Sequence, residues 1–150
     1  MVLMLSNLLL IPLAAASVSS EAALRNEFIQ AERQIGSLQY PQAQKLLSKF
    51  ADYPLQPYLQ QRRLQQFLNA DQRIADFLQQ YENTPLDWPL RKPWLLDLAR
   101  RQQAGIYLAN YPGSGDAELE CLALRFKLAA KDVDSATLWP DVSNLWLAGK

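Results

Sequence analysis

Two pairs of acidic residues in the second half of the chain are the groups whose type and spacing could support acid–base chemistry. They are Glu118/Glu120 and Asp132/Asp134. A carboxyl group that donates a proton to a breaking bond needs a raised pKa and a cleft that holds it. On a helix, a spacing of two residues points the members of a pair apart, and no aromatic or apolar cleft is evident around them. We interpret Glu118 as a charge near a helix N-terminus and the others as solvated, and predict no catalytic residue.

Other catalytic and ligand-binding groups are missing from the sequence. It contains no histidine, which removes imidazole catalysis and the commonest zinc ligand, and its single cysteine, Cys121, cannot build a thiolate metal site. Gly113-Ser114-Gly115 neither follows a strand pattern nor precedes Lys-Ser/Thr, as a phosphate-binding loop would. We therefore predict no metal site and no cofactor.

The charge balance argues against nucleic acid or an acidic membrane as partner. Fifteen acidic residues balance 15 basic ones, and the basic pairs Arg62/Arg63, Arg91/Lys92 and Arg100/Arg101 are scattered. We interpret these pairs as solvated helix faces.

Glutamine pairs suggest polar helix faces as well. Glutamine can hydrogen-bond sugars, but a strong, uncharged helix former on a solvated surface explains the pairs more simply, so we predict no glycan-binding residues. The pairs are Gln60/Gln61, Gln65/Gln66, Gln79/Gln80 and Gln102/Gln103.

The elements that carry these residues are predicted to be helices, because apolar side chains recur at intervals of three and four. A first helix is expected over residues 21 to 38, followed by a turn at Tyr40. A second helix is expected to begin at Pro41 and to form an antiparallel hairpin with the first. Their apolar stripes are Leu24, Phe28, Ala31, Ile35 and Leu38, then Ala43, Leu46, Leu47 and Phe50.

A joint at Pro54 and Pro57 follows the hairpin. Each proline biases the preceding residue out of the α region, so the helix should end near Ala51, and Tyr53 and Gln56 should be extended. The large side chains expected to wedge between the flanking helices are Tyr53, Leu55, Tyr58 and Leu59.

The next helices are expected on either side of residues 69 to 71, with Asp71 as N-cap of the second. Their stripes are Leu59, Arg63, Leu64, Phe67 and Leu68, then Ile74, Phe77, Leu78 and Tyr81. A stretch with three prolines follows that should not be one helix, and Trp88 and Trp94 are expected to anchor it. The prolines are Pro85, Pro89 and Pro93.

Four more helices are expected from Pro93 onward. The first turns Leu95, Leu98 and Ala99 inward and residues 100 to 103 to solvent, and a short helix with Ile106 and Leu108 ends in the turn 111 to 115. Asp116 caps a helix through Leu119, Leu122, Ala123, Phe126 and Ala130. Residues 131 to 134 turn, and the last helix carries Leu138, Trp139, Val142, Leu145 and Trp146, kinked or restarted at Pro140.

Short paired helices and no strand pattern predict an all-α fold: stacked helical hairpins that form an α-superhelix, or solenoid, segment. Residues 31 to 54 resemble a degenerate tetratricopeptide unit, but the later pairs do not keep that spacing. The stack is therefore expected to be irregular and only tetratricopeptide-like.

The first 16 residues are typical of a signal peptide. Leu3 to Leu13 is an apolar run too short for the roughly 20 helical residues that span a bilayer, and Ala14-Ala15-Ala16 offers small residues for cleavage after Ala16. No Lys or Arg precedes Arg25, so either the signal is weak or the start lies inside a longer leader. We expect a signal peptide over 1–16, a helical segment over 17–150, and no membrane span after cleavage.

Two strings carry a family resemblance. Residues 52 to 59 read D-Y-P-L-Q-P-Y-L and residues 145 to 150 read L-W-L-A-G-K. They resemble the D-Y-P-L-x-P-Y-L joint and the L-W-L-x-G-K string of soluble lytic murein transglycosylases, in that family's N-terminal superhelical region. The family's catalytic Glu-Ser pair and G-L-M-Q string, which belong to a C-terminal lysozyme-like domain, do not occur here.

The resemblance implies a non-catalytic scaffold segment of a periplasmic enzyme. The full-length family cleaves the MurNAc–GlcNAc bond of peptidoglycan and leaves 1,6-anhydroMurNAc ends, and this segment would help form the arc that admits glycan strands. Its implied partners are those strands, further helices after residue 150 and the catalytic domain. The chain alone is expected to be inactive and truncated at its C-terminal end.

Cys121 and the last helix leave two questions open. A lone buried thiol is the default for Cys121, whereas the resemblance implies a disulfide partner beyond residue 150. The last helix carries three apolar residues that should require a covering neighbour: Leu145, Trp146 and Leu147. We therefore predict dimerisation or poor solubility. The alternative function is an exported tetratricopeptide-like adaptor that binds a protein and has no enzymatic context.

Overall fold

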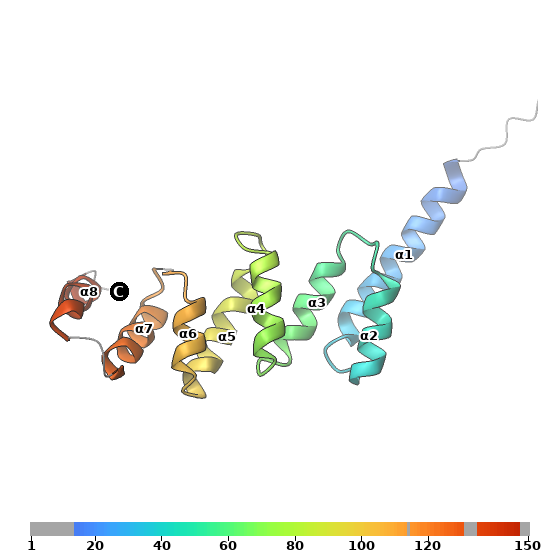
Figure 1. Cartoon of the computed structure of the whole chain (residues 1–150). Helices are drawn as coiled ribbons and strands as arrows, with labels where there is room; N and C mark the ends of the chain where they lie inside the picture. Colours follow the sequence, from blue (N-terminus) through green and yellow to red (C-terminus); the bar gives the residue numbers. More distant parts are fainter. Residues whose placement is uncertain (1–13, 114, 131–134, 148–150) are drawn as a thin grey trace, which may run out of the picture. The chain divides into compact units, whose positions relative to one another are not determined.

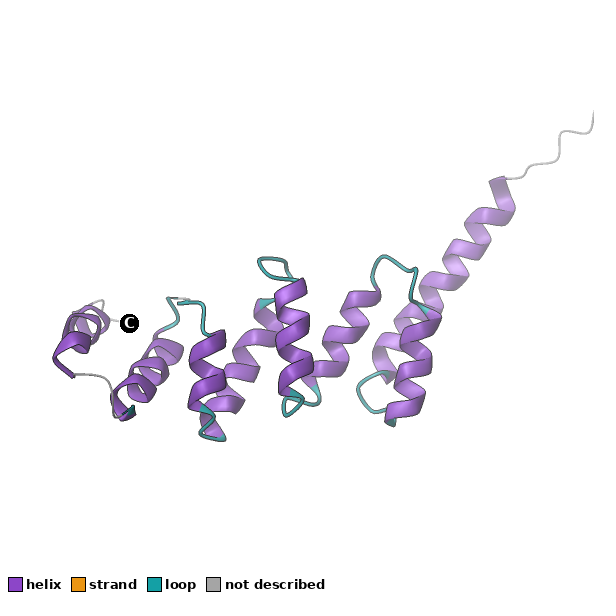
Figure 2. Cartoon of the chain, in the orientation of Figure 1, coloured by secondary structure: helices purple, strands orange, loops and turns teal. Residues whose placement is uncertain are grey.

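The computed structural model describes residues 14–113, 115–130 and 135–147, and every regular element in that part of the chain is an α-helix (Figure 2). The eight helices there are α1 (Ala14–Gln34), α2 (Tyr40–Lys49), α3 (Gln56–Gln65), α4 (Asp71–Gln80), α5 (Trp88–Arg100), α6 (Ala104–Asn110), α7 (Ala117–Ala129) and α8 (Ser135–Leu147). The predicted all-α class of stacked helical hairpins is confirmed. None of the described helices is both long enough and apolar enough to cross a membrane.

The chain divides into two compact units, Met1–Leu59 and Gln60–Lys150. In the first unit α1 and α2 form the predicted hairpin, and three aromatic rings meet in its core: Phe28 lies 5.5 Å from Phe50 and 4.9 Å from Tyr53 between ring centroids. The buried side chains of this unit are Phe28, Ala31, Ile35, Ala43, Phe50 and Leu59. Leu24, expected on the inner stripe, is 38% exposed.

Helix α1 also differs from its predicted bounds. It begins at Ala14, ends at Gln34 and runs through Ala16, the expected cleavage position. The first 13 residues of the predicted signal peptide lie outside the described residues, so the leader stays a prediction.

The joint between α2 and α3 is tighter than predicted. Gln56 is the first residue of α3 instead of extended, because Pro57 falls in the first helical turn, where a missing N–H leaves no hydrogen bond unmade. Leu59 is fully buried and Tyr53 half-buried, as expected, but Leu55 and Tyr58 are 44% and 41% exposed. Adjacent residues on a helix point roughly 100° apart, so burying Leu59 turns Tyr58 outward.

The core of the second unit is built around α5. This helix packs against α4, α6 and α7, and α7 packs in turn against α6 and α8, as the sequential helices in Figure 1 illustrate. Trp94 and Tyr107 are its largest fully buried side chains. The other buried members are Ile74, Phe77, Leu78, Leu86, Leu90, Leu95, Leu98, Ala99, Leu119, Ala123 and Phe126.

Helix α5 corrects part of the prediction for the proline-rich stretch. Pro85 lies in the turn before it, so the whole stretch is not one helix, as predicted, but the helix begins at Trp88 instead of Pro93. Pro89 lies in its first turn and Pro93 inside it. A proline at 93 leaves the carbonyl of Pro89 without its usual donor four residues on. Gln65 of α3 supplies a donor in its place, with Nε2 3.1 Å from Pro89 O, and Gln61 of the same helix donates through Nε2 to the carbonyl of Leu86, just before α5, at 2.6 Å.

These contacts also correct the interpretation of the glutamine pairs. Gln61 is buried instead of solvated. Of the two expected anchors, Trp94 is buried and Trp88 is 40% exposed. Six residues along a helix amount to a rotation of roughly 240°, so the two indoles cannot face the same core.

The turn before α7 is as predicted. Gly113 and Gly115 take positive φ angles of 69° and 70°, which glycine adopts without strain. Asp116 caps α7, its Oδ1 accepting from the N–H of Leu119 at 3.3 Å.

Helix α8 is continuous through Pro140, so the predicted restart there is wrong. Leu138 is buried, whereas Trp139, Trp146 and Leu147 are 69%, 85% and 80% exposed. The apolar surface expected at the end of the chain is present. The predicted turn at 131 to 134 lies outside the described residues.

Candidate functional site

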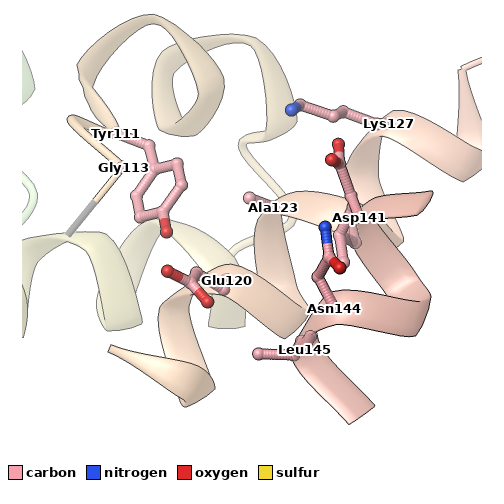
Figure 3. A pocket seen from close by; sticks show the side chains of 9 residues that line it. Tyr111, Gly113, Glu120, Ala123, Lys127, Asp141, Asn144 and Leu145 are labelled. Atoms are coloured by element: carbon pink, nitrogen blue, oxygen red, sulfur yellow. The ribbon is translucent and has the colours of Figure 1, made fainter. Parts of the chain in front are cut away.

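A cleft between α7 and α8 is lined by several polar side chains of the second unit. Its volume is about 340 Å³. The loop after α6 forms one wall (Figure 3). The lining residues are Tyr111, Gly113, Glu120, Ala123, Leu124, Lys127, Asp141, Asn144 and Leu145.

Helical spacing places these side chains along the cleft. On α7, Glu120, Ala123, Leu124 and Lys127 stand at i, i+3, i+4 and i+7, which is one face of a helix. On α8, Asp141, Asn144 and Leu145 repeat the pattern at i, i+3 and i+4. In Figure 3 the Tyr111 hydroxyl and the Glu120 carboxylate lie on one side, and Lys127, Asp141 and Asn144 lie on the other.

Four polar side chains of the cleft pair with no other described residue. The side chains of Glu120, Lys127, Asp141 and Asn144 make no hydrogen bond or ion pair within the part of the chain that the structure describes. Glu120 and Lys127 are half-buried, and Asp141 and Asn144 are exposed. The cleft therefore presents two acceptor carboxylates, an ammonium donor and an amide that can do both.

The buried side chain of Tyr107 supports the wall of the cleft that Tyr111 forms. The ring of Tyr111 stacks on that of Tyr107, with centroids 5.8 Å apart, and Tyr107 also meets Phe126 at 5.2 Å. The hydroxyl of Tyr107 donates to Leu119 O at 2.7 Å. Burial is the main cause that raises the pKa of Tyr107 far above its ordinary value, so this phenol stays protonated and keeps α6 joined to α7.

The first turn of α7 is tied to α5 by an ion pair between Lys92 and Asp116. The hydrogen bond from Lys92 is the main cause that lowers the pKa of Asp116, with the backbone N–H of Leu119 contributing. The same bond raises the pKa of Lys92. Two neighbouring helices are thus fixed by a carboxylate that is also a helix cap.

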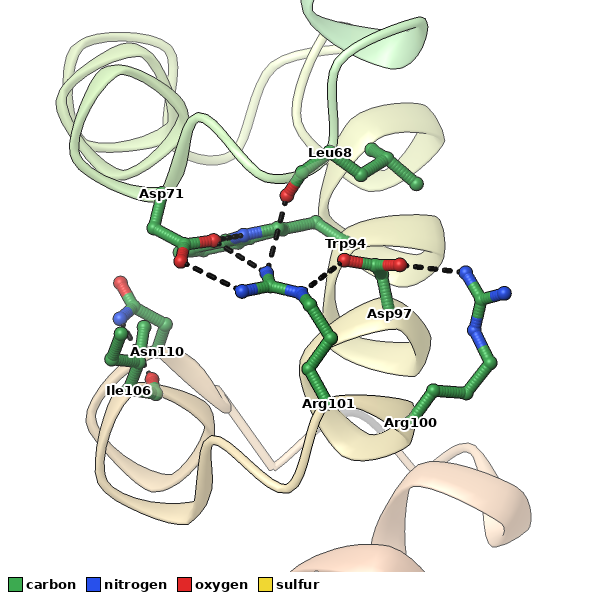
Figure 4. A network of polar contacts seen from close by, with 8 residues as sticks. All are labelled: Leu68, Asp71, Trp94, Asp97, Arg100, Arg101, Ile106 and Asn110. Atoms are coloured by element: carbon green, nitrogen blue, oxygen red, sulfur yellow. Dashed lines mark hydrogen bonds and ion pairs between the residues drawn. The ribbon is translucent and has the colours of Figure 1, made fainter.

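A second polar network lies away from the cleft and joins α4 to α5 (Figure 4). Asp71 was expected to cap α4, but Ala70 occupies the cap position and Asp71 begins the helix. Its carboxylate accepts from Arg101 Nη1 and Nη2 at 3.0 and 2.7 Å and from Trp94 Nε1 at 2.8 Å. The hydrogen bonds from Arg101 are the main cause that lowers the pKa of Asp71.

This network corrects the interpretation of the basic pairs as solvated. Arg101 also donates through Nε to Asp97 at 2.6 Å, and Arg91 is 8% exposed, bound to Asp87 and to the carbonyl of Asn110 at 3.0 Å. Asp87/Arg91 and Asp97/Arg101 stand four residues apart, and opposite charges at this spacing on a helix can pair. The sequence therefore contained a signal for these two ion pairs. Arg100 is solvated as expected, its side chain 73% exposed.

The two acidic pairs that could have supported acid–base chemistry lie in different surroundings. Glu118 lies in the first turn of α7, as predicted, whereas Glu120, interpreted as solvated, lines the cleft. Asp132 and Asp134 lie outside the described residues. Within the described part no group of three or more Cys, Asp or Glu side chains is arranged to hold a metal ion. The arrangement can hydrogen-bond a polar ligand.

Cys121 is exposed on α7, so the expectation of a buried thiol is wrong. It stands two residues after the buried Leu119, a rotation of roughly 200° about the helix axis, and therefore points away from the buried side of the helix. The disulfide with a residue beyond position 150 stays a prediction.

Fold and cleft together define an all-α protein of stacked helical hairpins with a polar groove in its second unit. No family model matches the chain, and no solved structure matches it significantly. It is, however, similar to the soluble lytic murein transglycosylase of Salmonella typhimurium, with 28% identity over 129 residues. The match covers 84% of this chain and 20% of the relative, so the resemblance seen in residues 52–59 and 145–150 is confirmed as distant homology to part of a longer protein.

Proposed function

We propose that this chain is a non-catalytic helical scaffold segment of a periplasmic lytic murein transglycosylase. In the full-length protein it helps to form the path along which glycan strands reach a catalytic domain that cleaves the MurNAc–GlcNAc bond. The observation that carries the proposal is the similarity to the Salmonella protein along 84% of the chain. Export, the signal peptide over 1–16 and a stack that continues beyond residue 150 are parts of the same proposal.

The absence of a suitable acid in the cleft supports a scaffold role. Cleavage of a glycosidic bond uses a carboxylic acid with a raised pKa, held against the bond oxygen. Asp141 is exposed and Glu120 half-buried, and both stand in a cleft open to water. The sequence also lacks the family's Glu-Ser pair.

The catalytic half of the proposal is tested on purified, protein-free murein sacculi. We expect the chain alone to release no soluble product that carries a 1,6-anhydro end, measured by mass spectrometry of the supernatant. A full-length lytic transglycosylase in a parallel tube shows that the sacculi are cleavable. Release of anhydro products by the chain alone would refute the non-catalytic role.

A second candidate function is an exported adaptor that binds another protein. It is favoured by an apolar groove of about 610 Å³ between α7 and α8, next to the polar cleft and sharing Leu124 and Leu145 with it. Leu124, Leu128, Val142, Leu145 and Trp146 line it, with Cys121 and Arg125. An adaptor with no enzymatic context should not associate with protein-free sacculi, and the scaffold segment should.

A further inference from the structure

The α7–α8 cleft has a mixed surface that selects against most ligand classes. Glu120 and Asp141 repel phosphates and other anions, and no basic patch surrounds Lys127 within the cleft. A purely apolar ligand would strip water from four polar side chains without replacing their hydrogen bonds, which is unfavourable. A ligand that suits the cleft is uncharged and rich in both donors and acceptors.

An N-acetylated sugar has that character. Its hydroxyls donate to the carboxylates of Glu120 and Asp141, and its acetamido group can pair with the amide of Asn144 and accept from Lys127. The C–H faces of the ring and the acetyl methyl need apolar neighbours, which Ala123, Leu124 and Leu145 provide. A volume of about 340 Å³ falls at the small end of ligand sites, roughly 300 to 1,000 Å³, which suits a single sugar unit better than a long stretch of strand.

The α7 wall of the cleft is held in place before any ligand arrives. Tyr107 joins α6 to α7 through its bond to Leu119, and Lys92 joins α5 to the first turn of α7 through Asp116. Preformed walls lower the ordering cost of binding.

We propose that the cleft formed by Glu120, Lys127, Asp141 and Asn144 is a subsite that binds one N-acetylated amino sugar of a glycan strand. The inference rests on the proposed function for the source of the sugar. It adds a defined position at which the scaffold holds the strand.

The test is a titration of the ¹⁵N-labelled chain with N-acetylglucosamine tetramer, followed by two-dimensional NMR. The glucose tetramer with the same linkage, which has hydroxyls in place of acetamido groups, is the matched ligand control. We expect the acetylated tetramer to shift the amide signals of residues 120–127 and 141–145, including the side-chain amide of Asn144, and the glucose tetramer to bind at least about tenfold more weakly, a difference of about 1.4 kcal/mol.

Two variants locate the site. Glu120→Gln with Asn144→Ala should weaken binding about tenfold or more, while Glu118→Gln, an exposed acid two residues nearer the start of α7, should leave it unchanged. Circular dichroism checks that each variant is folded, and Lys127→Met serves as a second variant if the double variant unfolds.

The possible results distinguish a failure of the proposed subsite from a failure of the proposed function. Signal shifts elsewhere on the chain, equal binding of both tetramers, or full affinity in the folded variants would overturn the subsite. If the wild-type chain still sediments with sacculi in those cases, the proposed function stands and only the subsite fails. If neither tetramer nor sacculi bind, both fail.

Discussion

Asp71 lies at the centre of a polar network that joins two helices of the second unit. Its carboxylate accepts from two nitrogens of Arg101 and from the indole of the fully buried Trp94. Arg101 in turn binds Asp97 and the carbonyl of Leu68. One residue thus joins the start of α4 to the length of α5, which is the helix that most of this unit packs against.

Replacing Asp71 with alanine should destabilise the chain by about 1–3 kcal/mol, because the Trp94 N–H is left buried without its acceptor and Arg101 loses a bidentate partner. Urea denaturation followed by circular dichroism measures the change. The control is Asp76→Ala on the exposed side of α4, whose cost should stay within about 0.5 kcal/mol. Equal costs for the two variants would contradict the role given to Asp71.

Acid should destabilise the protein through Asp71 and Asp116. The pKa of each is lower in the folded chain than the ordinary value of about 3.9, so the unfolded state binds protons more readily. Their stabilising effect is present above about pH 4 and is lost as the pH falls through the lowered folded-state pKa.

Thermal melts between about pH 6 and pH 2 test the direction of this pH dependence. The midpoint temperature of unfolding should fall once the pH drops below about 4. In Asp71→Asn the acid-dependent fall should be shallower. A midpoint that is constant or rises towards pH 2 would show that the two carboxylates do not stabilise the fold by this mechanism.

At the scale of elements, α5 shows how two helices cooperate around prolines. Pro93 deprives the carbonyl of Pro89 of its helical donor, and Gln65 of α3 replaces that donor. Gln61, four residues earlier on α3, donates to the carbonyl of Leu86 just before α5, so one face of α3 makes both contacts.

A double-mutant cycle on Gln65 and Pro93 tests this substitution of donors. Gln65→Ala should cost about 0.5–1.5 kcal/mol in the wild-type chain and less in Pro93→Ala, where an N–H at position 93 can bond the Pro89 carbonyl. Gln66→Ala, at an exposed position in the turn directly after α3, is the control. An identical cost of Gln65→Ala in both backgrounds would contradict the proposed coupling.

Periodicity in the sequence predicts the helices well but not what joins them. The stripes through Phe28, Ile35 and Ile74 and the cap at Asp116 depend on neighbours within a turn or two, so local spacing reveals them. The roles of Asp71, Gln61 and Arg101 depend on partners more than 20 residues away. Nothing in the local pattern distinguishes them from solvated polar side chains.

The cleft could not be predicted from the sequence for the same reason. Glu120 and Lys127 share a face of α7, which the sequence shows, but that face meets Asp141 and Asn144 only because α8 packs against α7. Once that pairing is known, the spacing of three and four on both helices accounts for the lining.

At the scale of the whole molecule, the exposed end of α8 should control self-association. Trp139, Trp146 and Leu147 are all more than two-thirds exposed, and large apolar side chains in contact with water favour association. Light scattering of the isolated chain should show dimers or larger species, and Trp146→Ser with Leu147→Ser should shift it towards monomer. Leu55→Ser, at an exposed site in the first unit, should not. A clean wild-type monomer would contradict this expectation.

The central claim, that this chain is a murein-binding scaffold without activity of its own, is tested most directly by sedimentation with protein-free sacculi. We predict that the chain pellets with the sacculi, that soluble N-acetylglucosamine tetramer competes it off, and that the supernatant contains no anhydro product. A chain that stays in the supernatant at every sacculus concentration would contradict the account.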